Sequence, residues 1–191
     1  MQACESLEEA HRQGIVHRDL KPSNVMLCKV ALTYDFVKVL DFGLAKLTQG
    51  DNKVTHKTRT GSVMGTPYYM SPEQCEGKIE IDHRADIYSL GVLLFEMLTG
   101  KVPFGGDGYG EIIVKHVTMP PPSVRSVVPE LPEYLDIILY RALAKDRDQR
   151  FQTMKEVQAA LGALKHESDS GMLYRTRAGM EPWPKPKRTP K

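Results

Sequence analysis

The stretch HRDLKPSN, from His17 to Asn24, gathers an imidazole, a guanidinium, a carboxylate, an ammonium and an amide in one short segment. The apolar run 25–27 follows it directly, and a short apolar run of this kind predicts a strand. Reactive side chains on a loop beside a strand are typical of a catalytic site, because loops carry function on a rigid scaffold. This stretch therefore decides both the expected fold and the expected chemistry.

Two further motifs extend the pattern toward the C-terminus. The tripeptide DFG, residues 41–43, follows a second apolar run at 37–40, and GTPYYMSPE occupies residues 65–73. The two apolar runs predict a β-pair joined by a loop over residues 29–35. Residues 44–72 are polar and aperiodic, which predicts a long loop, and long loops inside compact domains are usually functional. Taken singly, an Asp and Asn pair such as that of the first motif is usually a turn, and the tripeptide 41–43 is a plausible turn too.

Helical periodicity accounts for most of the remaining sequence. Helices are predicted over residues 2–13, 82–98 and 109–117, from Pro132 onward, and from Thr153 onward. The segment 82–98 is apolar nearly all round, so it is predicted to be buried on most sides. Gly14 and Gly100 stand where the first two of these helices should end. The predicted elements make the chain mainly α with a small β element, and 41% apolar residues are enough for a sizeable core.

Composition excludes several classes of function. A formal net charge of +2 argues against a protein built to bind nucleic acid. The three cysteines form no CxxC pair, so neither a zinc site nor a disulfide framework is indicated. No apolar run approaches the about 20 residues that a membrane-spanning helix needs. We therefore expect a cytoplasmic protein without a membrane segment. The tail over residues 165–191 is basic and rich in proline, so we expect it to be disordered.

In this order, the three motifs resemble those of the protein kinase family. The phrases 7–11 and 68–74 are similar to the eukaryotic-like serine/threonine kinases of bacteria. The resemblance covers residues 1–164 and implies the C-terminal lobe of the α+β protein-kinase-like fold, in an incomplete form. It implies ATP and Mg²⁺ as cofactors, and proteins with Ser or Thr hydroxyls as the partners that receive the γ-phosphate.

The resemblance gives the motif residues their expected roles. Asp19 would take the proton of the attacking hydroxyl, and Lys21 would offset the charge of the transferred phosphate. Asn24 and Asp41 would supply the hard oxygen ligands that Mg²⁺ prefers. Thr66 would hydrogen-bond Asp19 and Lys21. The implied ATP-contacting set is Lys21, Ser23, Asn24, Met26 and Asp41, with Met26 beneath the adenine.

A second set of residues would support the site. His17 and Phe42 would stack, Gly43 would allow the sharp turn after the metal ligand, and Asp86 would hold the backbone of the 17–18 turn. Glu73 would pair with Arg150 in a buried ion pair, with two solvated side chains as the alternative.

Regulation is indicated by Arg18, which directly precedes the catalytic carboxylate. Its guanidinium would bind a phosphate on the activation segment. The candidate acceptors are Thr58, Thr60 and Ser62, with Thr60 preferred, and solvated loop hydroxyls are the alternative. A kinase dimer or self-phosphorylation would belong to the full-length parent.

Only sixteen residues precede His17, so we expect the N-terminal lobe, with its glycine-rich strands and lysine, to be missing. The run 105–110 lacks the Gly-x-Gly-x-x-Gly spacing of a nucleotide loop and is expected to connect two helices. Because that lobe would be missing, we expect the chain alone to bind ATP weakly and to transfer little or no phosphate. Two functions therefore remain open: a serine/threonine kinase present as a fragment, or a non-catalytic kinase-like interaction module.

Overall fold

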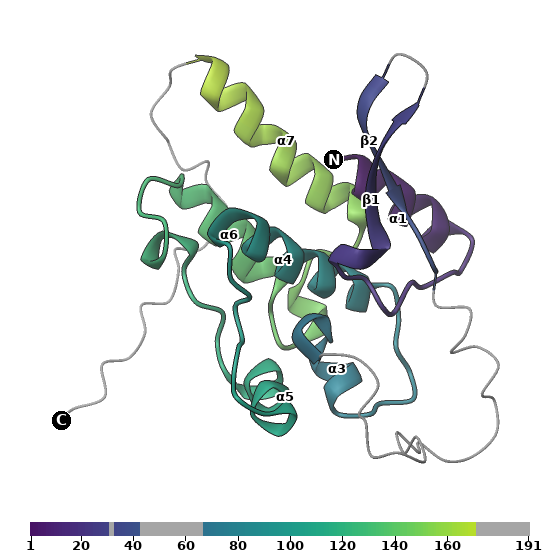
Figure 1. Cartoon of the computed structure of the whole chain (residues 1–191), viewed down its shortest axis with the longest axis vertical. Helices are drawn as coiled ribbons and strands as arrows, with labels where there is room; N and C mark the ends of the chain where they lie inside the picture. Colours follow the sequence, from purple (N-terminus) through teal and green to yellow (C-terminus); the bar gives the residue numbers. More distant parts are fainter. Residues whose placement is uncertain (31–32, 43–66, 171–191) are drawn as a thin grey trace.

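The computed structural model describes residues 1–30, 33–42 and 67–170 (Figure 1). Its first part consists of helix α1 (Gln2–Arg12), the 3-10 turn η1 (Pro22–Asn24) and the strands β1 (Val25–Val30) and β2 (Thr33–Val39). The second part consists of η2 (Pro67–Tyr69), α3 (Pro72–Cys75), α4 (Arg84–Thr99), α5 (Tyr109–Thr118), η3 (Val124–Ser126), α6 (Glu133–Ala142), η4 (Arg147–Gln149) and α7 (Met154–Ser170). The predicted mainly helical chain with a small β element is therefore found in the described residues.

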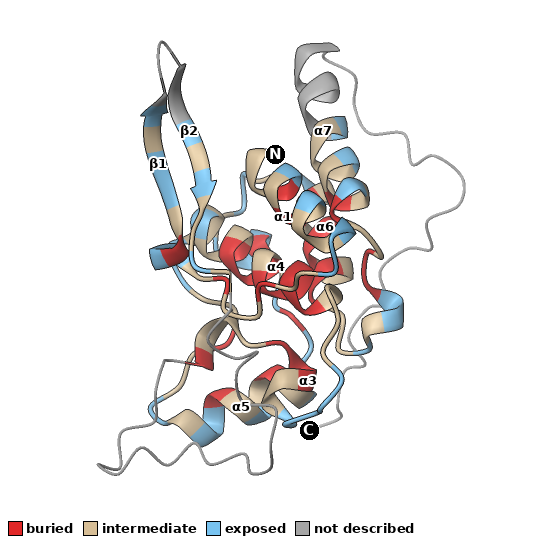
Figure 2. Cartoon of the chain, turned by 90° about the vertical axis from the view of Figure 1, so that its right-hand side faces the viewer, coloured by how far each residue is buried: buried red, intermediate tan, exposed pale blue. Residues whose placement is uncertain are grey.

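Helix α4 forms the centre of the molecule (Figure 2). Its side chains are buried on several sides, as the all-round apolar pattern predicted. Gly91 permits a close approach to α6, because a Cβ at this position would lie 3.0 Å from the Cβ of Ala142. The helix ends at Gly100, whose φ of 72° is the left-handed conformation that favours glycine. Helix α1 packs against α7, and α3 packs against α5.

The sheet is a two-stranded antiparallel hairpin whose register runs from Val25 opposite Val39 to Val30 opposite Thr33. Both strands extend into the segment 29–35, which was predicted to be a loop. The predicted strands were too short, because Thr33 and Tyr34, both of which favour β-structure, belong to the second strand. The hairpin projects beyond the helices (Figure 2), and it leaves the apolar side chains of Met26, Leu27 and Phe36 exposed.

The C-terminal helices differ from the sequence prediction in three details. Helix α6 begins at Glu133, directly after Pro132. The backbone N–H of Glu156 donates to Thr153 Oγ1 at 3.2 Å, but the Glu156 carboxylate accepts from the backbone of Gln152, so only half of the expected capping box forms. Helix α7 continues to Ser170, past the predicted domain boundary at residue 164. Among the described residues, no helix has the length and apolar character to cross a bilayer.

Candidate active site

The loop between α1 and η1 is held by one buried carboxylate. Asp86, near the start of α4, is fully buried, and its two oxygens accept the backbone N–H groups of His17 and Arg18, each at 2.8 Å. Arg18 has a φ of 64°, a left-handed conformation that costs a residue with a side chain about 1–2 kcal/mol. The two backbone hydrogen bonds offset this cost and fix the turn that presents Asp19.

His17 connects this turn to the second motif. Its Nε2–H donates to the carbonyl of Leu40 at 2.8 Å, and its Nδ1 accepts the backbone N–H of Asp19 at 3.3 Å. Its ring lies 5.0 Å from that of Phe42, tilted by 54°. The buried imidazole therefore joins the two segments that carry the candidate catalytic and metal-binding carboxylates.

Three predicted catalytic-loop side chains form one hydrogen-bonded group. Lys21 Nζ donates to Asp19 Oδ2 at 2.8 Å, and both side chains are partly exposed. Asn24 is buried, and its Nδ2 donates to the carbonyl of Asp19 at 2.8 Å. The carboxylate of Asp19 is therefore accessible to solvent and lies beside a positive charge.

The backbone brings Asn24 and Asp41 together. Leu40 N–H donates to the Asn24 carbonyl at 2.8 Å, so the exposed Asp41 lies one residue beyond that bond. Because Nδ2 of Asn24 is bound to Asp19, its Oδ1 is left as an acceptor, with Ser23 Oγ 3.5 Å away. An amide oxygen and a carboxylate fit Mg²⁺, which takes few protein ligands and shares the rest with phosphates. In the described ranges, no cluster of three or more His, Cys, Asp or Glu offers a competing metal site.

The expected ion pair between Glu73 and Arg150 is present and buried. Arg150 donates to both oxygens of Glu73, at 2.8 and 2.7 Å, and it also donates to the carbonyls of Ala144, Arg84 and Lys145. Burial raises the pKa of Glu73, but the hydrogen bonds and charge of Arg150 outweigh it and hold the pKa below its usual value. The pair ties α3 to the segment before α7.

Three contacts at the site were missed by sequence reasoning. Gln74 of α3 donates from Nε2 to the Arg18 carbonyl at 2.7 Å, and Tyr69 donates to a carboxylate oxygen of Glu96 at 2.6 Å. His11 of α1 donates to Asp86 Oδ2 at 2.8 Å. Only His11 had a signal: it follows the buried Cys4 and Leu7 at helical spacing, on the face of α1 turned toward the core.

Several predicted residues lie outside the described part of the chain. These are Gly43, the candidate phosphorylation sites Thr58, Thr60 and Ser62, and Thr66. Met26 is described, lies on β1 and is half exposed.

The chain belongs to the protein kinase family: the family model described as "Protein kinase domain" matches residues 1–161. Among its relatives is the "Serine/threonine-protein kinase Pkn1" of Myxococcus xanthus, 42% identical over 93% of this chain and 25% of that protein. The "Serine/threonine-protein kinase pkn3" of the same species is 40% identical over 87% of the chain and 30% of its own length. The "Serine/threonine-protein kinase PknB" of Mycolicibacterium smegmatis is 44% identical over 83% of the chain and 24% of its length. The chain thus spans about a quarter of the length of these relatives.

Proposed function

We propose that this chain is the larger part of the catalytic domain of a protein serine/threonine kinase, which transfers the γ-phosphate of ATP to Ser and Thr hydroxyls of proteins. The observation that supports this most is the hydrogen-bonded group of Asp19, Lys21 and Asn24 on a turn fixed by Asp86. The names of the bacterial relatives support the same reaction.

The residues of the chain would divide the work in the following way. Asp19 orients the incoming hydroxyl and accepts its proton, because its carboxylate is the accessible base of the group. Lys21 moves from Asp19 toward the transferred phosphate and offsets its charge. The oxygens of Asn24 and Asp41 hold Mg²⁺, which when bound neutralises charge on the phosphates. The resemblance implies that Thr66, which lies outside the described residues, would hydrogen-bond Asp19 and Lys21.

Residues 1–164 would form the C-terminal lobe, and a second, β-rich lobe would cover ATP. This part of the proposal is supported by the hairpin, where Met26 is 50% and Leu27 66% exposed beside the catalytic loop. Because these consecutive strand residues point to opposite faces of the hairpin, both of its faces expose apolar surface, which is typical of an element that another body covers. Without that cover, ATP would retain only the contacts near Asn24 and Asp41, so the chain alone would bind it weakly.

The test joins the chain behind the ATP-covering lobe of a bacterial serine/threonine kinase and measures transfer of labelled γ-phosphate to a generic protein substrate. Asp19→Asn should lower kcat by about 10²–10⁴-fold, the usual contribution of a positioned acid or base. Asp107→Asn, an exposed carboxylate in the segment before α5, is the matched control and should leave kcat unchanged. Equal rates for the two variants would contradict the role of Asp19.

A separate measurement addresses the lobe. Calorimetric titration of the 191-residue chain with ATP and Mg²⁺ should give much weaker binding than titration of the joined protein. Equal affinities would refute the need for a covering lobe and would leave the kinase proposal standing, so the two ideas fail independently.

A further inference from the structure

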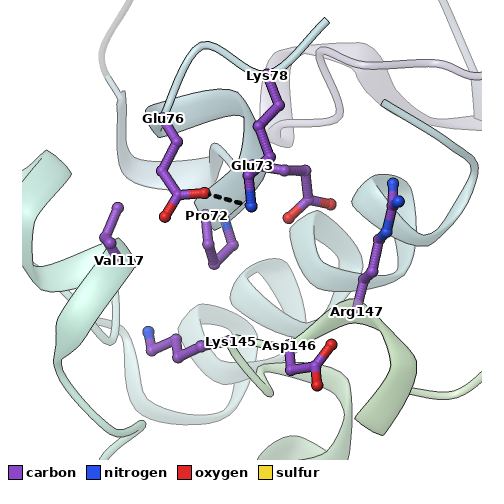
Figure 3. A pocket seen from close by; sticks show the side chains of 8 residues that line it. All are labelled: Pro72, Glu73, Glu76, Lys78, Val117, Lys145, Asp146 and Arg147. Carbon is purple, nitrogen blue, oxygen red and sulfur yellow. Dashed lines mark ion pairs between the residues drawn. The ribbon is translucent and has the colours of Figure 1, made fainter. Parts of the chain in front are cut away.

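A pocket of about 270 Å³ lies between α3, the end of α5 and the segment before η4, and no residue of the stretch 17–24 lines it (Figure 3). Most of the charged groups that line it already have partners. Glu76 is paired with Lys78 at 2.7 Å, and Arg147 is paired with Asp82 outside the pocket at 3.2 Å. Lys145 also lines the pocket, and within the described ranges no carboxylate lies at ion-pair distance from its ammonium.

The partners of the Lys145 amine are neutral. Its Nζ lies 3.3 Å from Tyr88 Oη and 3.4 Å from the carbonyl of Lys115, both long for hydrogen bonds of an ammonium. It stands 4.0 Å from the centre of the Phe104 ring. Tyr88 in turn is 2.9 Å from Nδ1 of His116 and can donate its proton there. The amine therefore sits at the start of a short buried chain of neutral groups.

Among the described residues, no acidic group around the pocket forms an ion pair with Lys145. On α3, burial raises the pKa of the Cys75 thiol to about 12, and the carboxylate of Glu73 is bound to Arg150. On α5, burial first, and then the charge of Lys145, lower the pKa of His116 to about 4, which leaves it neutral. The Asp146 carboxylate, which also lines the pocket, accepts the backbone N–H of Asp148.

Lys145 is consequently held in a state that favours the free amine. Burial first, and then the charge of Arg150, lower the pKa of Lys145 to about 7. Arg150 is bound to the carbonyl of Lys145 itself, at 3.1 Å, so this positive charge is fixed beside the side chain. A free amine is a nucleophile, whereas an ammonium is not, and desolvation beside a cation is a recognised way to activate a lysine.

We propose that this pocket is a modification site at which small acyl phosphates acylate Lys145. The lone pair of Nζ attacks the acyl carbon, a C–N bond forms, and the C–O bond to the phosphate breaks. The phosphate leaves with the electron pair, and the amine proton passes to the phosphate or to solvent. Lys78 and Arg147 at the pocket offer positive charge to the anionic leaving group.

The product fits the site. An amide retains one N–H, which can donate to Tyr88 Oη or to the carbonyl of Lys115. Acylation also removes a positive charge beside Arg150, so the buried pair with Glu73 is not weakened by it. The proposal does not depend on phosphoryl transfer by the chain.

The folded 191-residue chain is incubated with acetyl phosphate between about pH 6 and 10, and acetylation of each lysine is followed by peptide mass spectrometry. At pH 7, Lys145 should react about tenfold or more faster than Lys155, which is exposed and does not line the pocket. Roughly half of Lys145 is free amine at this pH, whereas a lysine side chain in a model peptide is well under 1% free amine. The rate of Lys145 should level off above about pH 8, whereas the rate of Lys155 should rise throughout.

Two controls separate the pocket from ordinary surface reactivity. Unfolding the chain in urea should abolish the preference for Lys145. Val117→Phe, which narrows the pocket from α5, should slow acetylation of Lys145 and leave that of Lys155 unchanged in a chain whose circular dichroism spectrum is preserved. A Lys145 rate at or below that of Lys155 at pH 7, or a rate that climbs in parallel with that of Lys155 to pH 10, would overturn the proposal.

Discussion

Glu73 and Arg150, 77 positions apart in the sequence, meet in a bidentate ion pair that is almost completely buried. Three backbone carbonyls accept the remaining hydrogen bonds of the guanidinium. Both charges are therefore satisfied without water, and α3 is bound directly to the segment that precedes α7. A buried pair of this kind contributes little to net stability, but removal of one partner leaves the other as an uncompensated buried charge.

Removal of Arg150 should therefore destabilise the chain strongly. Arg150→Met leaves the Glu73 carboxylate buried without its partner, and the free energy of unfolding should fall by about 3–5 kcal/mol. Urea unfolding followed by circular dichroism measures this change. Asp148→Asn is the control, since Asp148 is 77% exposed in its pair with Arg84 and exposed pairs contribute about 1 kcal/mol or less. Similar losses in the two variants would contradict a buried pair.

Acid should weaken the same pair. The pKa of Glu73 is held below 4.5 in the folded chain, so the unfolded chain binds the proton first. The stabilisation is complete above pH 4.5 and is lost as the pH falls through the lower folded value. The free energy of unfolding should decline below pH 4.5 less steeply for Glu73→Gln than for the unchanged chain. Asp82, whose pKa lies at about 2, contributes in the same range, so Asp82→Asn serves as the comparison. Parallel curves for Glu73→Gln and the unchanged chain would exclude Glu73 as a source of the acid sensitivity.

Asp86→Asn should loosen the turn that presents Asp19. The amide has one acceptor oxygen, so its NH₂ group must face one of the two backbone donors, at His17 or Arg18. The free energy of unfolding should fall by about 2–3 kcal/mol, because a buried donor is left unpaired. Hydrogen exchange at these two amides should also accelerate, and this is a local readout.

The control for this prediction is Asp136→Asn. Asp136 accepts from the backbone of Val124 at 2.7 Å and from the hydroxyl of Ser123, far from the catalytic loop. Its replacement should cost stability without faster exchange at His17 and Arg18. Exchange that is equally fast in both variants would mean that Asp86 supports the fold in general and not this turn.

The sequence predicted features whose physical signals are local. Helix α4 followed from continuous apolar residues and a terminal Gly100, and the catalytic loop followed from residue types at fixed spacing. The hydrogen bond from Gln74 to the carbonyl of Arg18 had no such signal, because a side-chain-to-backbone contact over 56 residues depends on the tertiary fold. The pocket at Lys145 was missed for the same reason. Three separate segments enclose it, and none of them is unusual alone.

The last prediction concerns Arg18 and the activation segment. The Arg18 guanidinium makes one long hydrogen bond, to the Ile81 carbonyl at 3.4 Å, and within the described ranges it has no carboxylate at ion-pair distance. A phosphate on Thr60 would supply two charge-assisted hydrogen bonds to it. In the joined catalytic domain, Thr60→Ala should lower kcat by about ten- to hundredfold, the equivalent of one or two such bonds.

Arg18→Lys distinguishes the mechanism, because lysine keeps the charge but cannot bind a phosphate through a planar fork. It should lower the activity of the phosphorylated enzyme and leave the unphosphorylated enzyme unchanged, as measured after phosphatase treatment. Thr58→Ala and Ser62→Ala should each have a smaller effect than Thr60→Ala. Full activity in the triple alanine variant would exclude control by phosphorylation at these three positions, and Arg18 would then act only through the geometry of its turn.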